Sequence, residues 1–103
     1  MFGLSPKALA LIRKAASQFA EIESVIVFGS RAAGKSKPGS DVDLALRGSK
    51  IDSATVSRFY QLLQEELPLP FDFDVVHYDR MKNPALKQHI DGTGKILYSR
   101  KSS

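Results

Sequence analysis

The chain contains no cysteine, and this absence excludes disulfide bridges and metal centres built on thiolates. It has no apolar run that approaches the ~20 residues of a membrane-spanning helix. It also has no internal repeat and no low-complexity segment.

What is present is the composition of an ordinary globular protein. The chain has 103 residues, of which 43% are hydrophobic and 25% charged, and this predicts a single domain over residues 1–103. The net charge of +4 favours a polyanionic ligand. Because the basic residues are spread from Lys7 to Lys101, we expect a small polyanion rather than a dedicated nucleic-acid surface.

The first 20 residues carry basic side chains and no acidic one, as targeting peptides do. They lack a continuous apolar region, however, and their apolar residues recur with helical spacing. Ser5 and Pro6 are typical of a helix N-cap and first turn. We therefore predict a structural helix, with apolar positions as far as Ile22, and a cytoplasmic protein.

The rest of the chain alternates between strand and helix patterns. Strands are expected at residues 24–28, 41–46, 71–76 and 95–99. A helix capped by Asp52 or Ser53 ends before Pro68, and a short helix begins at Asn83-Pro84. The link between the first two strands is too short for a crossover helix, so antiparallel or mixed pairing is expected. These patterns predict an α/β (α+β) fold with a mixed sheet and helices packed on one face.

The most informative segment reads Gly29-Ser30, ten residues, then Asp41-Val42-Asp43. Residues two apart on a strand project from the same face, roughly 7 Å apart. Two carboxylates in this arrangement repel each other unless a cation lies between them. Oxygen ligands of this kind are typical of a divalent metal such as magnesium.

The residues before the two aspartates are suited to phosphate. Gly29 has no side chain, so the backbone can approach a phosphate closely. Ser30 offers a hydroxyl and a backbone N–H, and Arg31 can form a bidentate contact. Lys35 and Lys37 could neutralise a leaving pyrophosphate, although a solvated basic loop is the alternative interpretation.

Metal-dependent nucleotidyl transfer uses a cluster of about three carboxylates. Asp72 and Asp74 share one face of a later strand. Asp74 lies deeper in the apolar run, beside Val75 and Val76, where a carboxylate is costly to bury without a cation. We therefore choose Asp74 and keep Asp72 as the alternative. His77 follows this strand, and we favour a surface or core-edge histidine over a residue of the site.

Together, Gly29-Ser30, ten residues and Asp41-x-Asp43 resemble the signature of the DNA polymerase β-like nucleotidyltransferase superfamily. The short length resembles the minimal nucleotidyltransferases, the MNT proteins of bacteria and archaea. The resemblance implies a polymerase β-like fold in which Asp41 and Asp43 bind magnesium. It also implies that Asp74 completes the catalytic and metal site, and that Ser30 contacts the triphosphate of ATP beside Gly29 and Arg31.

The resemblance also implies a partner. Such proteins are commonly the antitoxins of a helical HEPN protein, a toxin or substrate-binding subunit, and several transfer AMP from ATP to a tyrosine of it. The larger antibiotic-modifying relatives carry a further domain that this chain lacks, which favours a separate helical partner. One alternative is a purely binding antitoxin that masks this partner. Another is a nucleic-acid-binding module, whose affinity would depend steeply on salt.

Overall fold

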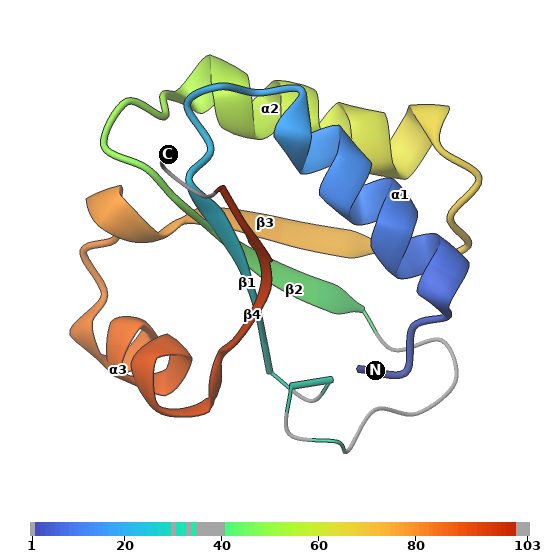
Figure 1. Cartoon of the computed structure of the whole chain (residues 1–103). Coiled ribbons are helices and arrows are strands. Elements are labelled where there is room, and N and C mark those ends of the chain that lie inside the picture. The colour runs from blue at the N-terminus through green and yellow to red at the C-terminus, as the bar shows by residue number, and fades with distance from the viewer. Residues whose placement is uncertain (1, 30, 33, 35–40, 101–103) are drawn as a thin grey trace.

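The computed structural model of the chain describes residues 2–29, 31, 32, 34 and 41–100. The elements in chain order are α1 (Pro6–Ser17), β1 (Ser24–Phe28), β2 (Val42–Arg47), α2 (Ser53–Gln61), a π-helical turn (Leu62–Glu66), β3 (Phe73–His77), a 3-10 turn (Tyr78–Arg80), α3 (Pro84–Thr93) and β4 (Lys95–Ser99) (Figure 1). Among the described helices, none combines the length and apolar character needed to cross a bilayer.

The four strands form one mixed sheet in the order β3-β2-β1-β4. Strand β1 runs antiparallel to both of its neighbours, β2 and β4, while β2 and β3 are parallel. Parallel neighbours need a crossover connection, and α2 with its π-helical continuation provides it. The predicted mixed sheet is therefore confirmed, as is the antiparallel pairing of the first two strands.

Helices cover both faces of the sheet. Helices α1 and α2 lie on one face and α3 on the other (Figure 1). Since side chains alternate along a strand, Val25 and Val27 of β1 contribute to the core beneath α1 and α2. Ile26 and Phe28 point the other way and join a second cluster with Ile90 of α3. The expectation of helices on one face thus holds for α1 and α2 but not for α3, because β1 is apolar on both sides.

The helix starts agree with the sequence, and the end of α1 differs from it. The side chain of Ser5 accepts a hydrogen bond from the N–H of Ala8 (3.1 Å), with Pro6 in the first turn. Helix α1 ends at Ser17, although the apolar spacing extended the prediction to Ile22. Phe19 still joins the core from the following turn, through an edge-to-face contact with Phe59. Apolar periodicity therefore located core residues here but overextended the helix.

Candidate active site

Asp43 and Asp74 are direct neighbours on adjacent strands. Asp43 of β2 is in register with Asp74 of β3, within the parallel pair. Residues paired in this way project from the same face, and neighbouring strands lie about 4.8 Å apart. Asp43 is half-buried, whereas Asp74 is exposed. The register therefore brings together two of the three carboxylates that the sequence singled out.

Asp41 immediately precedes β2 and contributes its charge to the same group. Burial raises the pKa of the Asp43 carboxyl above its usual value, and the negative charges of Asp74 and Asp41 raise this pKa further. The charge of His89, from α3, acts in the opposite direction and lowers the pKa. Asp43 is thus close enough to both Asp74 and Asp41 to be repelled by them, and a cation placed beside it would relieve this repulsion.

Asp72 is held differently from Asp74. Its carboxylate accepts a hydrogen bond from the side chain of Gln64 (3.2 Å), which belongs to the π-helical turn. The same Gln64 side chain accepts a hydrogen bond from the backbone N–H of Phe73 (3.0 Å). The carbonyl of Asp72 accepts from the N–H of Val42 (2.8 Å). Asp72 thus fastens the starts of two strands to a helix, while Asp74 faces Asp43.

Gly29 directly follows β1, whose last residue, Phe28, pairs with Asp43. The φ of +74° at Gly29 lies in the left-handed region that side chains disfavour. A Cβ atom at this position would lie 2.5 Å from Oδ2 of Asp43. The glycine therefore leaves room for a carboxylate, in addition to the close phosphate approach predicted from the sequence. Ser30, the next residue in the motif, lies outside the described residues, as do Lys35 and Lys37.

The Arg31 side chain is turned into the protein. It is 3% exposed, and its guanidinium donates hydrogen bonds to the backbone carbonyls of Asp41 (3.3 Å), Phe2 (3.1 Å) and Gly3 (3.3 Å). The guanidinium carbon also lies 5.0 Å from the centre of the Phe71 ring. A phosphate contact from Arg31 stays a prediction, and the described contacts point to a different use of this side chain.

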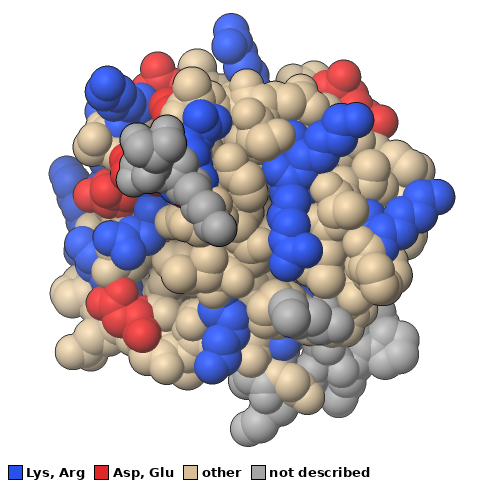
Figure 2. Space-filling view, in the orientation of Figure 1, with Lys and Arg blue, Asp and Glu red and all other residues tan. Residues whose placement is uncertain are grey.

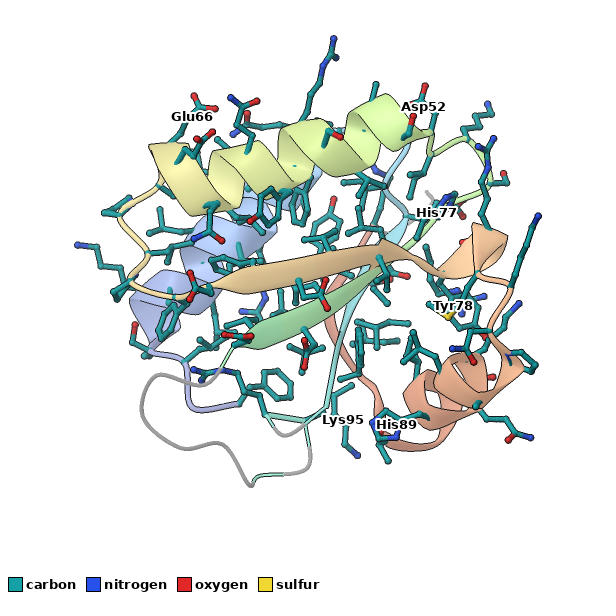
Figure 3. All side chains as sticks on the ribbon, turned by 180° about the vertical axis from the view of Figure 1, so that it is seen from behind. Asp52, Glu66, His77, Tyr78, His89 and Lys95 are labelled. Carbon is teal, nitrogen blue, oxygen red and sulfur yellow. The ribbon has the colours of Figure 1, made fainter. Side chains whose placement is uncertain are left out.

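The two histidines lie in different parts of the molecule. Nε2 of His77 is 3.0 Å from the carbonyl of Gly48, and the side chain is 10% exposed, so the core-edge interpretation is confirmed. His89 is the histidine whose charge reaches Asp43. Figure 3 shows His89 beside Lys95, away from His77 at the tip of β3. Sequence reasoning missed His89 because its proximity arises only when α3 folds back onto the sheet.

The chemistry of the carboxylate group suits a hard divalent cation. All three side chains offer oxygen ligands, which Mg²⁺ prefers. Burial is the main cause of the raised pKa of Asp43, and the neighbouring charges of Asp74 and Asp41 add to it, so a cation placed here would favour the ionised form. Within the part of the chain that the structure describes, the acidic and histidine side chains do not form a closed group of metal ligands. The carboxylate oxygens are of the type that magnesium prefers, but the described residues do not form a complete coordination site.

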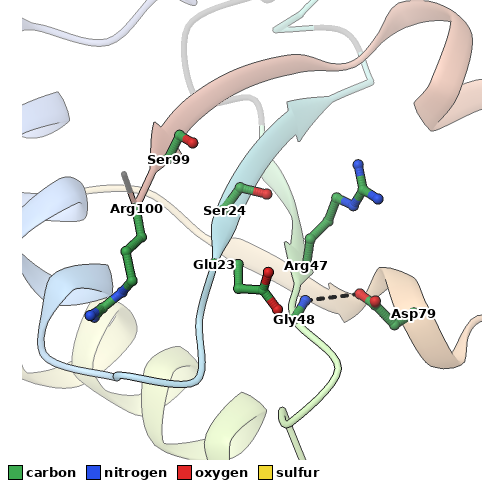
Figure 4. A pocket seen from close by; sticks show the side chains of 7 residues that line it. All are labelled: Glu23, Ser24, Arg47, Gly48, Asp79, Ser99 and Arg100. Atoms are coloured by element: carbon green, nitrogen blue, oxygen red, sulfur yellow. Dashed lines mark hydrogen bonds between the residues drawn. The ribbon is translucent and has the colours of Figure 1, made fainter. Parts of the chain in front are cut away.

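A separate hollow of about 310 Å³ lies at the other end of the sheet (Figure 4). Seven residues line this far-end pocket: Glu23, Ser24, Arg47, Gly48, Asp79, Ser99 and Arg100. Its carboxylates already accept hydrogen bonds from the backbone, Asp79 from Gly48 (2.9 Å) and Glu23 from Ser49 (3.3 Å). These bonds support the turn after β2, so we assign the pocket to the fold rather than to the chemistry.

The sequence matches a known family. A family model described as Polymerase beta, Nucleotidyltransferase matches residues 11–103. This match spans most of the chain, and the protein therefore belongs to the polymerase beta nucleotidyltransferase family. The resemblance inferred from the Gly29-Ser30 and Asp41-x-Asp43 motif is thus confirmed. A comparison with curated protein sequences gives no match.

Solved structures share the fold. One described as a toxin-antitoxin with AMP-PNP is 21% identical, with a TM-score of 0.72 over 95% of this chain and 76% of the other. A complex of the tri-AMPylated Shewanella oneidensis HEPN toxin with MNT antitoxin is 21% identical, with a TM-score of 0.69 over 91% and 71%. The toxin-antitoxin MntA-HepT is 20% identical, with a TM-score of 0.71 over 93% and 74%. At these identities the likeness establishes the polymerase β-like fold.

Proposed function

We propose that this protein is a magnesium-dependent nucleotidyltransferase that transfers AMP from ATP to a hydroxyl group. The acceptor is a tyrosine of a helical, HEPN-type partner protein, and the chain acts as the antitoxin of that partner. The use of ATP and magnesium agrees with a cytoplasmic location. The observation that carries the proposal is the in-register pairing of Asp43 with Asp74, close to Asp41, in a chain of this family.

Two further observations support a site for a metal-bound polyphosphate. The chain has a net charge of +4, and Figure 2 shows basic side chains dispersed over one face rather than gathered in a stripe. Such a distribution favours a small polyanion over a long nucleic acid. Gly29 also places no Cβ beside Asp43, where such an atom would lie 2.5 Å from Oδ2. A ligand could therefore approach the Asp43 carboxylate without meeting a side chain at position 29.

The proposed reaction is an in-line displacement at phosphorus. The oxygen of the acceptor hydroxyl attacks the α-phosphorus of ATP, the bond from that phosphorus to the bridging oxygen breaks, and pyrophosphate leaves. A carboxylate oxygen of Asp74 takes the hydroxyl proton. Asp41 and Asp43, with Asp74, would hold a pair of magnesium ions, which supply charge neutralisation and acidify the acceptor. Ser30 and Gly29 bind and orient the triphosphate, so that most of the catalysis comes from positioning.

The structural likenesses support this choice of partner and reaction. One of the similar complexes contains the ATP analogue AMP-PNP, and another contains a tri-AMPylated HEPN toxin together with its MNT antitoxin. These descriptions concern those proteins. They make AMP transfer to a helical partner the first reaction to test for this chain.

The decisive experiment combines the chain with labelled ATP, Mg²⁺ and the product of the adjacent gene. We expect the neighbouring protein to gain the mass of an adenylyl group on a tyrosine, which mass spectrometry of its peptides would locate. Chelation of magnesium should stop the reaction. The matched pair of variants is Asp43→Asn and Asp72→Asn, because Asp72 is bonded to Gln64 rather than directed at Asp43.

The outcomes separate catalysis from masking. Transfer by the wild type and by Asp72→Asn, with none by Asp43→Asn, would support the proposed enzyme. A wild-type chain that neutralises its partner without modifying it would refute AMP transfer and favour a masking antitoxin. Assays of partner neutralisation with Asp43→Asn then test whether the Asp43 carboxylate is needed for neutralisation.

A further inference from the structure

Arg31 is a charged side chain buried next to the proposed site. It is 3% exposed. A guanidinium in such a place is costly unless its N–H groups are hydrogen-bonded. Its described bonds go to backbone carbonyls, at 3.1 to 3.3 Å. Side chains that are buried and bonded in this way position the backbone they contact.

Hydrogen bonds and a ring contact connect Arg31 to three separate segments. Nε donates to the carbonyl of Asp41, immediately before β2. Nη1 donates to the carbonyls of Phe2 and Gly3, in the segment before α1. The guanidinium carbon lies over the ring of Phe71, 5.0 Å from its centre. Only a planar, forked side chain can make all of these contacts, so lysine is a poor substitute.

Two of these segments lead directly to the carboxylates. Phe71 contacts the ring of Phe73 edge to face, with the ring centres 6.4 Å apart. Phe73 pairs with Val42, one residue before the pair formed by Asp43 and Asp74. The N–H of Val42 in turn bonds to the carbonyl of Asp72 (2.8 Å). Arg31 therefore fastens the beginnings of β2 and β3 at the level where the carboxylates lie.

We infer that Arg31 is a positioning residue that fixes the backbone beneath Asp41, Asp43 and Asp74, and that the segment before α1 is part of this support. Its role in AMP transfer rests on the proposed function. This assignment differs from the phosphate contact suggested by the position of Arg31 after Gly29-Ser30. The two roles predict different behaviour. A side chain that binds phosphate would not depend on hydrogen bonds to the carbonyls of Phe2 and Gly3, whereas a positioning residue would.

Gly3 allows the support to be tested from its other side. Gly3 has a φ of 69°, in the left-handed region where a β-branched residue is strained. The substitution Gly3→Val should therefore turn the carbonyls of Phe2 and Gly3 away from Arg31 without changing any charge. Arg13→Gln is the matched control, because Arg13 also donates from Nε to a backbone carbonyl, that of Leu97 in β4 (2.8 Å).

The first experiment measures AMP transfer by Arg31→Lys, Arg31→Gln and Gly3→Val, and by the double variant that combines Arg31→Gln with Gly3→Val. We expect kcat to fall about 10- to 100-fold for each, as when a residue that supports metal ligands is lost, with a smaller change in KM for ATP. The combined variant should be little worse than either single one. Arg13→Gln should retain the wild-type kcat. A rise in KM for ATP restricted to the Arg31 variants would overturn the inference.

The second experiment does not depend on catalysis. Hydrogen exchange at the N–H of Val42 should be faster in Arg31→Gln and in Gly3→Val than in the wild type, and unchanged in Arg13→Gln. Far-UV circular dichroism and melting identify any variant that fails to fold, and the milder Arg31→Lys then takes its place. If the wild type transfers no AMP, the proposed function fails, while faster exchange still supports the positioning role. Unchanged exchange at Val42 would overturn it whatever the activity.

Discussion

Carboxylates lie at both ends of the sheet, and the two groups have different surroundings. In the far-end pocket, Asp79 and Glu23 accept hydrogen bonds from the N–H groups of Gly48 and Ser49. At the other end, no described residue donates a hydrogen bond to Asp43, and its pKa is raised. A carboxylate that serves the fold obtains its donors from the chain. This contrast agrees with the proposed role of Asp43 as a metal ligand.

The largest expected effect is that of Asp43→Asn. Without the charged oxygens, AMP transfer should fall by at least about 10²-fold, the usual loss when one preorganised electrostatic group is removed. The fold should not suffer. Because the pKa of Asp43 is raised in the folded protein, its ionised form opposes folding at neutral pH, and a neutral side chain removes this cost. The melting temperature should equal or exceed that of the wild type. Full turnover by this variant would contradict the assigned role.

The next largest effect separates Asp74 from Asp72. Asp74→Asn should reduce transfer nearly as strongly as Asp43→Asn, since it removes the in-register neighbour and the proposed proton acceptor. Asp72→Asn should retain most of the activity, because an amide oxygen can still accept the hydrogen bond from Gln64. Initial rates at saturating ATP give the comparison. The reverse ranking would make Asp72 the third carboxylate.

Gly29→Ala should affect activity and stability together. The new Cβ would lie 2.5 Å from Oδ2 of Asp43, at a φ of +74°. A residue forced into this conformation costs about 1 to 3 kcal/mol, which denaturant unfolding would measure. Transfer should also fall, because the Asp43 carboxylate must move. An active and fully stable Gly29→Ala protein would show that this end of β1 is less constrained than the geometry implies.

The smallest expected effect is that of Asp79→Ala, the far-end counterpart of Asp43→Asn. Loss of its hydrogen bond to Gly48 should lower the free energy of unfolding by about 1 kcal/mol. AMP transfer should be unchanged, because the far-end pocket does not contact the carboxylates of the proposed site. Both AMP transfer and the free energy of unfolding should be measured for this variant. A large loss of AMP transfer would show that the far-end pocket does contribute to the reaction.

Local patterns predicted much of this fold. The β-branched run of β1, the caps at Ser5 and Asn83, and the prolines that follow them are short-range features that the structure retains. The choice of Asp74 over Asp72 came from depth in an apolar run, but both side chains are exposed, so burial does not separate them. The role of Asp74 as a ligand stays a prediction.

Other features depend on contacts between segments far apart in the chain. The sequence cannot say that α3 crosses to the second face of the sheet, which is what brings His89 near Asp43. The burial of Arg31 requires Phe2, Asp41 and Phe71 to meet, and a basic residue after a Gly-Ser turn looks the same whether it binds phosphate or carbonyls. Pattern reasoning fails here because tertiary packing decides the outcome.

The crowding around Asp43 also has a thermodynamic consequence. If a divalent cation binds among these carboxylates, it removes a repulsion that the folded protein otherwise bears, and it binds the unfolded chain far less well. Linkage then requires the melting temperature to rise with the concentration of Mg²⁺ or of the magnesium complex of a non-hydrolysable ATP analogue. A thermal titration of the wild type beside Asp43→Asn would therefore report occupancy of the site before any acceptor protein is known.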